Sequence, residues 1–278
     1  MAIMRLEFGR RKRKIPVIGI RQVGKSYFFF TLAHIVSELG WGEVDNVDYF
    51  HDMFQYILNG LPIPPTMERT PINLFVDKVD IGESSIPCNF YIYTEDFGGA
   101  EFEELMRSLA KGELSTIRPE QKDLLDAFIN LFRNADGIII MIDVVRLTDG
   151  KGNLVTVTAD EFRKKRDECI RSSLAEQVVP LTKAIDIFIK MNPNVKGKPV
   201  FFVFTKSDVH GMDKAEIENY FARLMAINLA RLRRRGFIIK WYNVASYGFG
   251  GKSTTSLLRQ FGYTELLQDI ADYLGRRR

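Results

Sequence analysis

Gly19-Ile20-Arg21-Gln22-Val23-Gly24-Lys25-Ser26 is the stretch of sequence that decides the fold. It matches the pattern G-x-x-x-x-G-K-[ST]. Its first two residues end an apolar strand pattern at 15–20, and its last residue begins a helical pattern over 26–39. Such a turn is typical of a phosphate-binding loop, because glycines admit a close backbone approach and successive N–H groups then point at the anion. The residues predicted to hold a nucleotide here are Gly19, Gln22, Val23, Gly24, Lys25, Ser26 and Tyr27. Lys25 would reach the β- and γ-phosphates, and the Ser26 hydroxyl would bind Mg²⁺.

The bulk composition is that of an ordinary globular chain. Its 278 residues, 46% hydrophobic and 27% charged, suit one α/β domain with insertions. The net charge of +4 does not by itself indicate a nucleic-acid-binding protein. Cys88 and Cys169 give no disulfide framework, no signal peptide is evident, and no apolar run approaches the ~20 residues of a membrane span. These features lead us to expect a cytoplasmic protein.

Strand and helix patterns alternate along the chain. Strand patterns cover 15–20, 72–81, 88–94, 137–144, 199–205 and 237–245, and helical patterns cover 26–39, 47–59, 101–109, 119–133, 159–191, 214–235 and 254–274. The segments 72–81 and 88–94 predict a hairpin around a glycine turn. Almost wholly apolar strands such as 137–144 are typical of a parallel sheet that is covered on both faces. Pro180 predicts a bend within the long helical stretch.

The predicted fold class is therefore α/β, of the P-loop NTPase type. We expect a mostly parallel sheet with one antiparallel edge strand, helices on both faces and helical insertions near 101–135 and 145–198. The predicted organisation is a single domain at 15–275, between a basic flank at 1–14 and a basic tail at 276–278.

Thr205-Lys206-Ser207-Asp208 follows a buried strand and suits the recognition of guanine. Guanine presents N1–H and N2–H₂ donors on one edge, and one carboxylate, that of Asp208, can accept both. Adenine offers no such pair. The aliphatic stem of Lys206 can cover the plane of the base. A polar turn after a strand is the simpler alternative for this tetrapeptide taken alone.

Two further segments complete a set of motifs in order. Asp96-Phe97-Gly98-Gly99-Ala100-Glu101 ends the hairpin's second strand, and Asn243-Val244-Ala245-Ser246-Tyr247 ends the last strand. With the two motifs above, they resemble a Ras-like P-loop GTPase of the translation-factor-related class, which includes prokaryotic Ras-like and double-GTPase-type members. The alternative for the first segment is an acidic turn whose Glu101 favours a helix N-terminus.

The resemblance implies roles for particular residues. Asp96 would hold Mg²⁺ through water, and the Gly99 N–H would contact the γ-phosphate. Loss of the γ-phosphate would then release residues 96–111 as a switch. The backbone of Ala245, Ser246 and Tyr247 would contact the guanine oxygen. Thr66 or Thr70 would be the first-switch threonine and a Mg²⁺ ligand; a proline-rich run before Thr66 favours Thr66. Capping hydroxyls in an irregular loop are the alternative for both threonines.

The sequence departs from this family at Ala100, where many members carry the glutamine that orients the attacking water. Alanine cannot hydrogen-bond a water, so we expect slow hydrolysis or the use of another group, with Glu101, Gln22 and Arg21 as candidates. Arg21 can supply charge in cis, but a solvent-facing or partner-facing position is the favoured interpretation. Gly248–Ser253 lacks the first glycine of a second phosphate loop and predicts an ordinary loop.

The predicted function is a GTP-binding switch with GTP/GDP and Mg²⁺ as ligands, whose catalytic residues would be Lys25, Thr66, Gly99 and Arg21. Its partners would be an effector that recognises the GTP state and an exchange or activating protein. A nucleotide-binding scaffold with little turnover is the alternative, and the guanine motif argues against an ATPase or kinase. The cations at Arg10–Lys14 suit contact with membrane or nucleic acid, but a solvated flank is the favoured interpretation.

Overall fold

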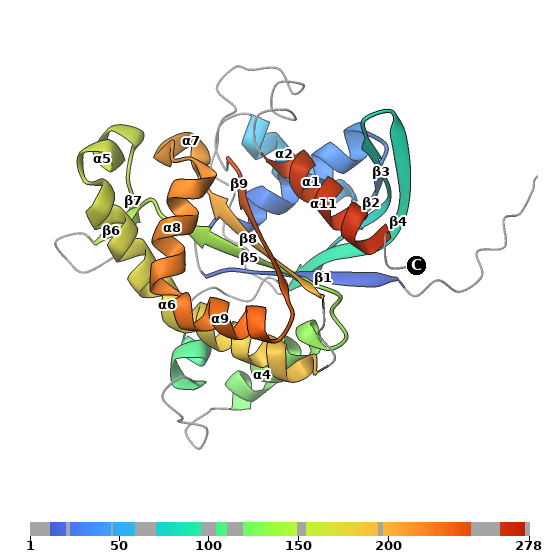
Figure 1. The fold of residues 1–278 in the computed structure, drawn as a ribbon. Coiled ribbons are helices and arrows are strands. Elements are labelled where there is room, and N and C mark those ends of the chain that lie inside the picture. The colour runs from blue at the N-terminus through green and yellow to red at the C-terminus, as the bar shows by residue number, and fades with distance from the viewer. Residues whose placement is uncertain are drawn as a thin grey trace, which may run out of the picture.

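The computed structural model describes residues 12–20, 23–45, 47–58, 71–95, 104–109, 119–148, 154–193, 197–245 and 262–275. A central sheet lies between two layers of helices (Figure 1). The main sheet contains β1 (Arg13–Ile18), β2 (Gly42–Val44), β3 (Pro71–Ile81), β4 (Ser84–Glu95), β5 (Ile138–Asp143), β8 (Pro199–Thr205) and β9 (Ile238–Asn243). In space their order is β2-β3-β4-β1-β5-β8-β9.

The strand directions confirm the predicted fold class. Strands β4, β1, β5, β8 and β9 run parallel, whereas β3 pairs antiparallel with β4 through the predicted hairpin. The structure adds the three-residue strand β2 outside β3. Every residue of β5 and β8 is buried, which is why both strands are wholly apolar up to their last residues.

Helices cover both faces of this sheet (Figure 1). They are α1 (Lys25–Glu38), α2 (Val47–Leu58), α4 (Pro119–Phe132), α5 (Ala159–Lys164), α6 (Arg166–Met191), α7 (Ser207–His210), α8 (Lys214–Leu224), α9 (Ala226–Arg234) and α11 (Tyr263–Gly275). On one side α1 and α11 contact β3, and on the other α6 contacts β5 while α8 and α9 contact β9. Residues 104–109 form a further helical segment. Within the described ranges, every helix is too short or too polar to cross a bilayer.

The 145–198 insertion differs in detail from the prediction. It begins with a small hairpin of β6 (Arg146–Thr148) and β7 (Leu154–Thr156), which the sequence pattern did not indicate. The helical stretch after it is interrupted at Lys165, with α6 continuing unbroken through a buried Pro180. Asp167 and Glu168 lie in the first turn of α6, where acidic side chains favour a new helix start. The predicted 214–235 helix is likewise divided at Met225.

The described end of the basic flank, residues 12–14, meets the sheet directly. β1 begins at Arg13, so Arg13 and Lys14 belong to the strand. The Lys12 ammonium lies 5.0 Å from the centroid of the Tyr91 ring and 5.3 Å from that of Phe75, and it donates a hydrogen bond of 2.6 Å to the Tyr91 hydroxyl. Cation–π contact therefore gives Lys12 a structural role on β3 and β4.

Candidate nucleotide-binding site

The loops that carry the predicted motifs collect at one edge of the sheet. Parallel strands point the same way, so the segments that follow β1, β5, β8 and β9 lie at their common carboxyl edge. The register places Asp143 beside Thr205, and Phe204 beside Asn243. Strands lie about 4.8 Å apart, so the ends of β1 and β8, with β5 between them, are about 10 Å apart. One nucleotide can bridge that separation, with its phosphates at one end and its base at the other.

Two glycines shape the phosphate loop after β1. At Gly19, a Cβ atom would lie 2.6 Å from Val23 Cγ1 and 3.1 Å from Met141 Cβ, so only glycine fits between the loop and β5. Gly24 adopts φ 93°, in the left-handed region that other residues avoid. Val23 is fully buried and anchors the loop in the core. The backbone turn that the motif predicted is therefore present in the described part of the loop.

The Lys25 ammonium and the N-terminal N–H groups of α1 come directly after this turn. The Lys25 ammonium donates to the Gly19 carbonyl oxygen at 3.0 Å, and Lys25, Ser26 and Tyr27 are all half-buried. Among the described residues, no side chain caps the start of α1, and its first turn contains no acidic residue. The N-terminal N–H groups of α1 and the ammonium therefore suit a phosphate. Ser26, on the first turn, has the hydroxyl that would bind Mg²⁺ beside that phosphate.

The guanine motif lies at the end of β8. The Thr205 hydroxyl is buried and donates to the Ile142 carbonyl oxygen at 3.3 Å. Lys206 adopts φ 63° and begins the turn, and the Ser207 N–H donates to the Val244 carbonyl oxygen at 3.1 Å. Asp208 is exposed in the first turn of α7. The fold thus brings the 205–208 loop to the end of β9.

The end of β9 is held in place by α11. The hydroxyl of Tyr263, a buried residue, donates to the Ala245 carbonyl oxygen at 2.9 Å, and its ring centroid lies 5.5 Å from that of Phe28 in α1. Gly262 has φ +74°, and a Cβ there would lie 2.2 Å from the Asn243 carbonyl oxygen. This glycine therefore permits α11 to start directly against the β9 loop.

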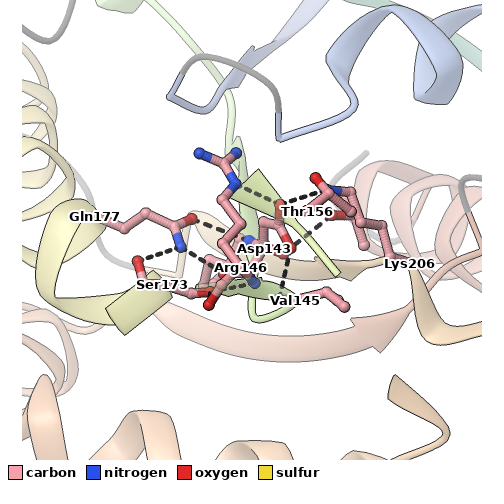
Figure 2. Close-up of polar contacts among 9 residues, drawn as sticks. Asp143, Val145, Arg146, Thr156, Ser173, Gln177 and Lys206 are labelled. Atoms are coloured by element: carbon pink, nitrogen blue, oxygen red, sulfur yellow. Dashed lines mark hydrogen bonds and ion pairs between the residues drawn. The ribbon is translucent and has the colours of Figure 1, made fainter. Parts of the chain in front are cut away.

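A buried polar network lies at the end of β5, between the start of the 205–208 loop and α6 (Figure 2). Its centre is Asp143, the last residue of β5, whose Oδ2 accepts from Lys206 Nζ at 2.6 Å and from Arg146 Nε at 2.7 Å. Burial by itself raises the pKa of Asp143, but these two cations outweigh it and hold that pKa below its usual value. The network therefore contains an ionised carboxylate between two cations.

Sequence reasoning missed this network. The sequence pattern places Asp143 in an apolar strand and predicts Lys206 only as a cover for the base. A signal was present, because an aspartate at the end of an otherwise apolar strand needs a partner if it is buried. The identity of its partners depends on the fold: Lys206 and Gln177 lie 63 and 34 residues away in the chain.

Several predicted site residues lie outside the described part of the chain. They are Arg21, Gln22, Thr66, Thr70, Asp96, Gly99, Ala100, Glu101, Ser246 and Tyr247, together with the 248–253 loop. β4 ends at Glu95, directly before Asp96, at the same carboxyl edge as the phosphate loop. The switch, water-positioning and metal-ligand roles predicted for these residues stay predictions.

The chain matches no known protein-family model and no curated protein sequence. Its structure is similar to the signal recognition particle receptor in the SRb-GTP/SRX complex from Chaetomium thermophilum, at 11% identity and a TM-score of 0.45, covering 95% of this chain and 99% of that one. It is also similar to a GTP-binding protein from Sulfolobus solfataricus in complex with GDP, at 14% identity and a TM-score of 0.38, covering 95% of this chain and 53% of that one.

A third similar structure is bacterial selenocysteine-specific elongation factor EF-Sec, at 13% identity and a TM-score of 0.40, covering 97% of this chain and 30% of that one. By their titles, the first of these structures contains GTP and the second contains GDP. All three likenesses are distant.

Proposed function

We propose that this chain is a GTP-binding protein that holds its nucleotide across the carboxyl edge of the sheet. One observation supports this function most directly: the Gly19–Ser26 loop and the Thr205–Asp208 loop flank β5 at the same edge. The first loop suits phosphates, and the second carries the carboxylate whose chemistry suits guanine. An ATP-binding protein would have no need of that carboxylate.

The nucleotide would be GTP or GDP with Mg²⁺. Lys25 would neutralise the β- and γ-phosphates, and Ser26, Thr66 and Asp96 would hold the metal. Lys206, Asp208 and the backbone of Ala245–Tyr247 would hold the base. We further propose a single domain at 15–275 in a cytoplasmic protein.

Turnover is proposed to be slow. Ala100 lacks the group that would orient an attacking water, so Lys25, Thr66, Gly99 and Arg21 are left with positioning and charge neutralisation. Such a protein acts as a switch that an effector reads in its GTP state, with exchange or activating proteins setting the rates. Ala100 also favours the second candidate function, a nucleotide-binding scaffold with little turnover.

A change of base preference tests the guanine assignment. Xanthine carries a C2 carbonyl acceptor where guanine carries an amine donor, and an asparagine amide can donate to it. Asp208→Asn should therefore weaken GDP binding and strengthen xanthosine diphosphate binding, each by at least about tenfold. Both affinities are measured by competition against a fluorescently labelled nucleotide. Asp126→Asn, an exposed change on α4, is the matched control and should alter neither affinity.

Mere damage to the loop would weaken both nucleotides together. An Asp208→Asn protein that keeps its preference for GDP would contradict the proposed role of Asp208. Single-turnover release of phosphate from bound GTP over hours separates a slow switch from a scaffold, because the scaffold would release little phosphate in that time.

A further inference from the structure

We propose that Asp143 is a positioning residue for base recognition that acts through Lys206, and that the β6–β7 hairpin is part of the same site. This inference rests on the proposed guanine-nucleotide function and names residues that the sequence motifs do not contain. Its basis is the ion pair between the end of β5 and the lysine of the guanine loop.

Asp143 is itself fixed from several sides. Its side chain is fully buried, and its Oδ1 accepts from the Val145 N–H at 2.8 Å while Oδ2 takes the two cations. Its backbone N–H donates to Gln177 Oε1 at 3.0 Å, and Gln177 Nε2 donates back to the Asp143 carbonyl oxygen. A carboxylate held in this way has one orientation and can therefore set the orientation of whatever binds to it.

Lys206 is the group that is being oriented. Its ammonium donates to Asp143 Oδ2 at 2.6 Å and to the Thr156 hydroxyl at 3.0 Å, and the residue is only 9% exposed. Lysine has a long, freely rotating stem, so its free form would lose conformational freedom when a base binds against it. Holding the ammonium beforehand removes that cost from the binding step. The stem of Lys206 is thereby placed at the start of the turn that leads to Asp208.

The hairpin and α6 belong to this arrangement. Thr156 lies on β7, and Arg146 begins β6 (Figure 2). The Arg146 N–H donates to the Ser173 hydroxyl at 2.8 Å, and both Ser173 and Gln177 come from α6. Through Thr156, the insertion therefore contacts the lysine of the guanine motif directly.

A double-mutant cycle tests this role. The variants are Asp143→Asn, Lys206→Ala and the two combined, with Asp186→Asn as control. Asp186 pairs with Arg231 near the end of α6, at the sheet edge opposite the site. The measurement is the dissociation constant for a fluorescent GDP analogue, together with a urea unfolding curve for each protein.

Asp143→Asn should weaken GDP binding about tenfold in the wild-type background. Added to Lys206→Ala it should change the affinity by less than about twofold, because the residue through which it acts is gone. An equal loss in both backgrounds, or no loss in either, would overturn the proposal. Asp186→Asn should bind GDP as the wild type does.

A milder variant covers the case in which Asp143→Asn does not fold. Thr156 is exposed, so Thr156→Val should fold and remove only the hydroxyl that accepts from Lys206. We expect GDP binding to weaken about threefold, with no loss in the Lys206→Ala background. The same loss in both backgrounds would overturn the proposal.

The outcomes separate the two proposals. A wild type that does not prefer GDP to ADP would end the guanine-nucleotide function. A wild type that prefers GDP, with an unaffected Asp143→Asn variant, would leave that function standing and remove the positioning role.

Discussion

His210, the last residue of α7, should make the stability of this protein depend on pH. Its ring is buried beside Phe162, with the ring centroids 6.4 Å apart, and its Nδ1 accepts from the Met212 N–H at 3.0 Å. Within the described ranges, its Nε2 has no hydrogen-bond partner. Burial lowers the pKa of His210 to about 4, with Asp143 and Glu216 opposing the shift and Arg166 adding to it.

The two pKa values of His210, in the unfolded and the folded chain, set the direction in which stability changes with pH. The unfolded chain titrates this group near 6.5 and the folded chain near 4, so between these values the unfolded state binds more protons. The free energy of unfolding therefore falls as the pH falls through this range. The difference corresponds to about 3 kcal/mol at its full extent, of which about 2 kcal/mol is already lost at pH 5.0.

Urea unfolding of the nucleotide-free protein at pH 7.5 and pH 5.0 measures this loss. His210→Asn keeps an oxygen that can accept from the Met212 N–H but cannot titrate in this range. We expect the wild type to lose about 2 kcal/mol more than this variant between the two pH values. His51→Asn, an exposed change on α2, should keep the wild-type loss. An equal loss in wild type and His210→Asn would refute the reasoning.

Two substitutions test the phosphate loop. Gly24→Ala places a Cβ on a residue at φ 93°, so it should lower the free energy of unfolding by about 1–2 kcal/mol, measured by urea unfolding. The same change should weaken GDP binding at least about tenfold, measured by titration. Unchanged values would show that the loop does not need this conformation. Ser26→Ala should abolish most of the strengthening of GTP binding by Mg²⁺ while leaving binding in EDTA within about threefold; an intact Mg²⁺ effect would remove Ser26 from the metal site.

The glycine turn after β1 and the buried strands could be predicted because their signals are local. Gly19 and Gly24 satisfy backbone requirements within a single turn, and the strands at Ile138–Asp143 and Pro199–Thr205 are apolar because both faces are covered. The hairpin at 72–94 was predicted from two strand patterns around a glycine turn. Each of these features depends on residues that are neighbours in sequence.

The features that were not predicted depend on contacts between distant residues or on very short elements. β6 and β7 have three residues each, too few for an alternating pattern to be recognised. Pro180 was expected to bend the helix, but the interruption lies at Lys165, where the chain starts a second helix with its own acidic first turn. The partners of Asp143 come from α6, the β6–β7 hairpin and the β8 loop, and only the folded chain brings them together (Figure 2).

Base selection by the nucleotide-free protein tests most directly whether the site reads guanine. The measurement is equilibrium competition of unlabelled GDP and ADP against one fluorescent nucleotide, in the same buffer and with Mg²⁺ present. Loss of two hydrogen bonds to the Asp208 carboxylate should make ADP bind at least about a hundredfold more weakly than GDP. Equal affinities, or a preference for ADP, would contradict the assignment of this chain as a guanine-nucleotide-binding protein.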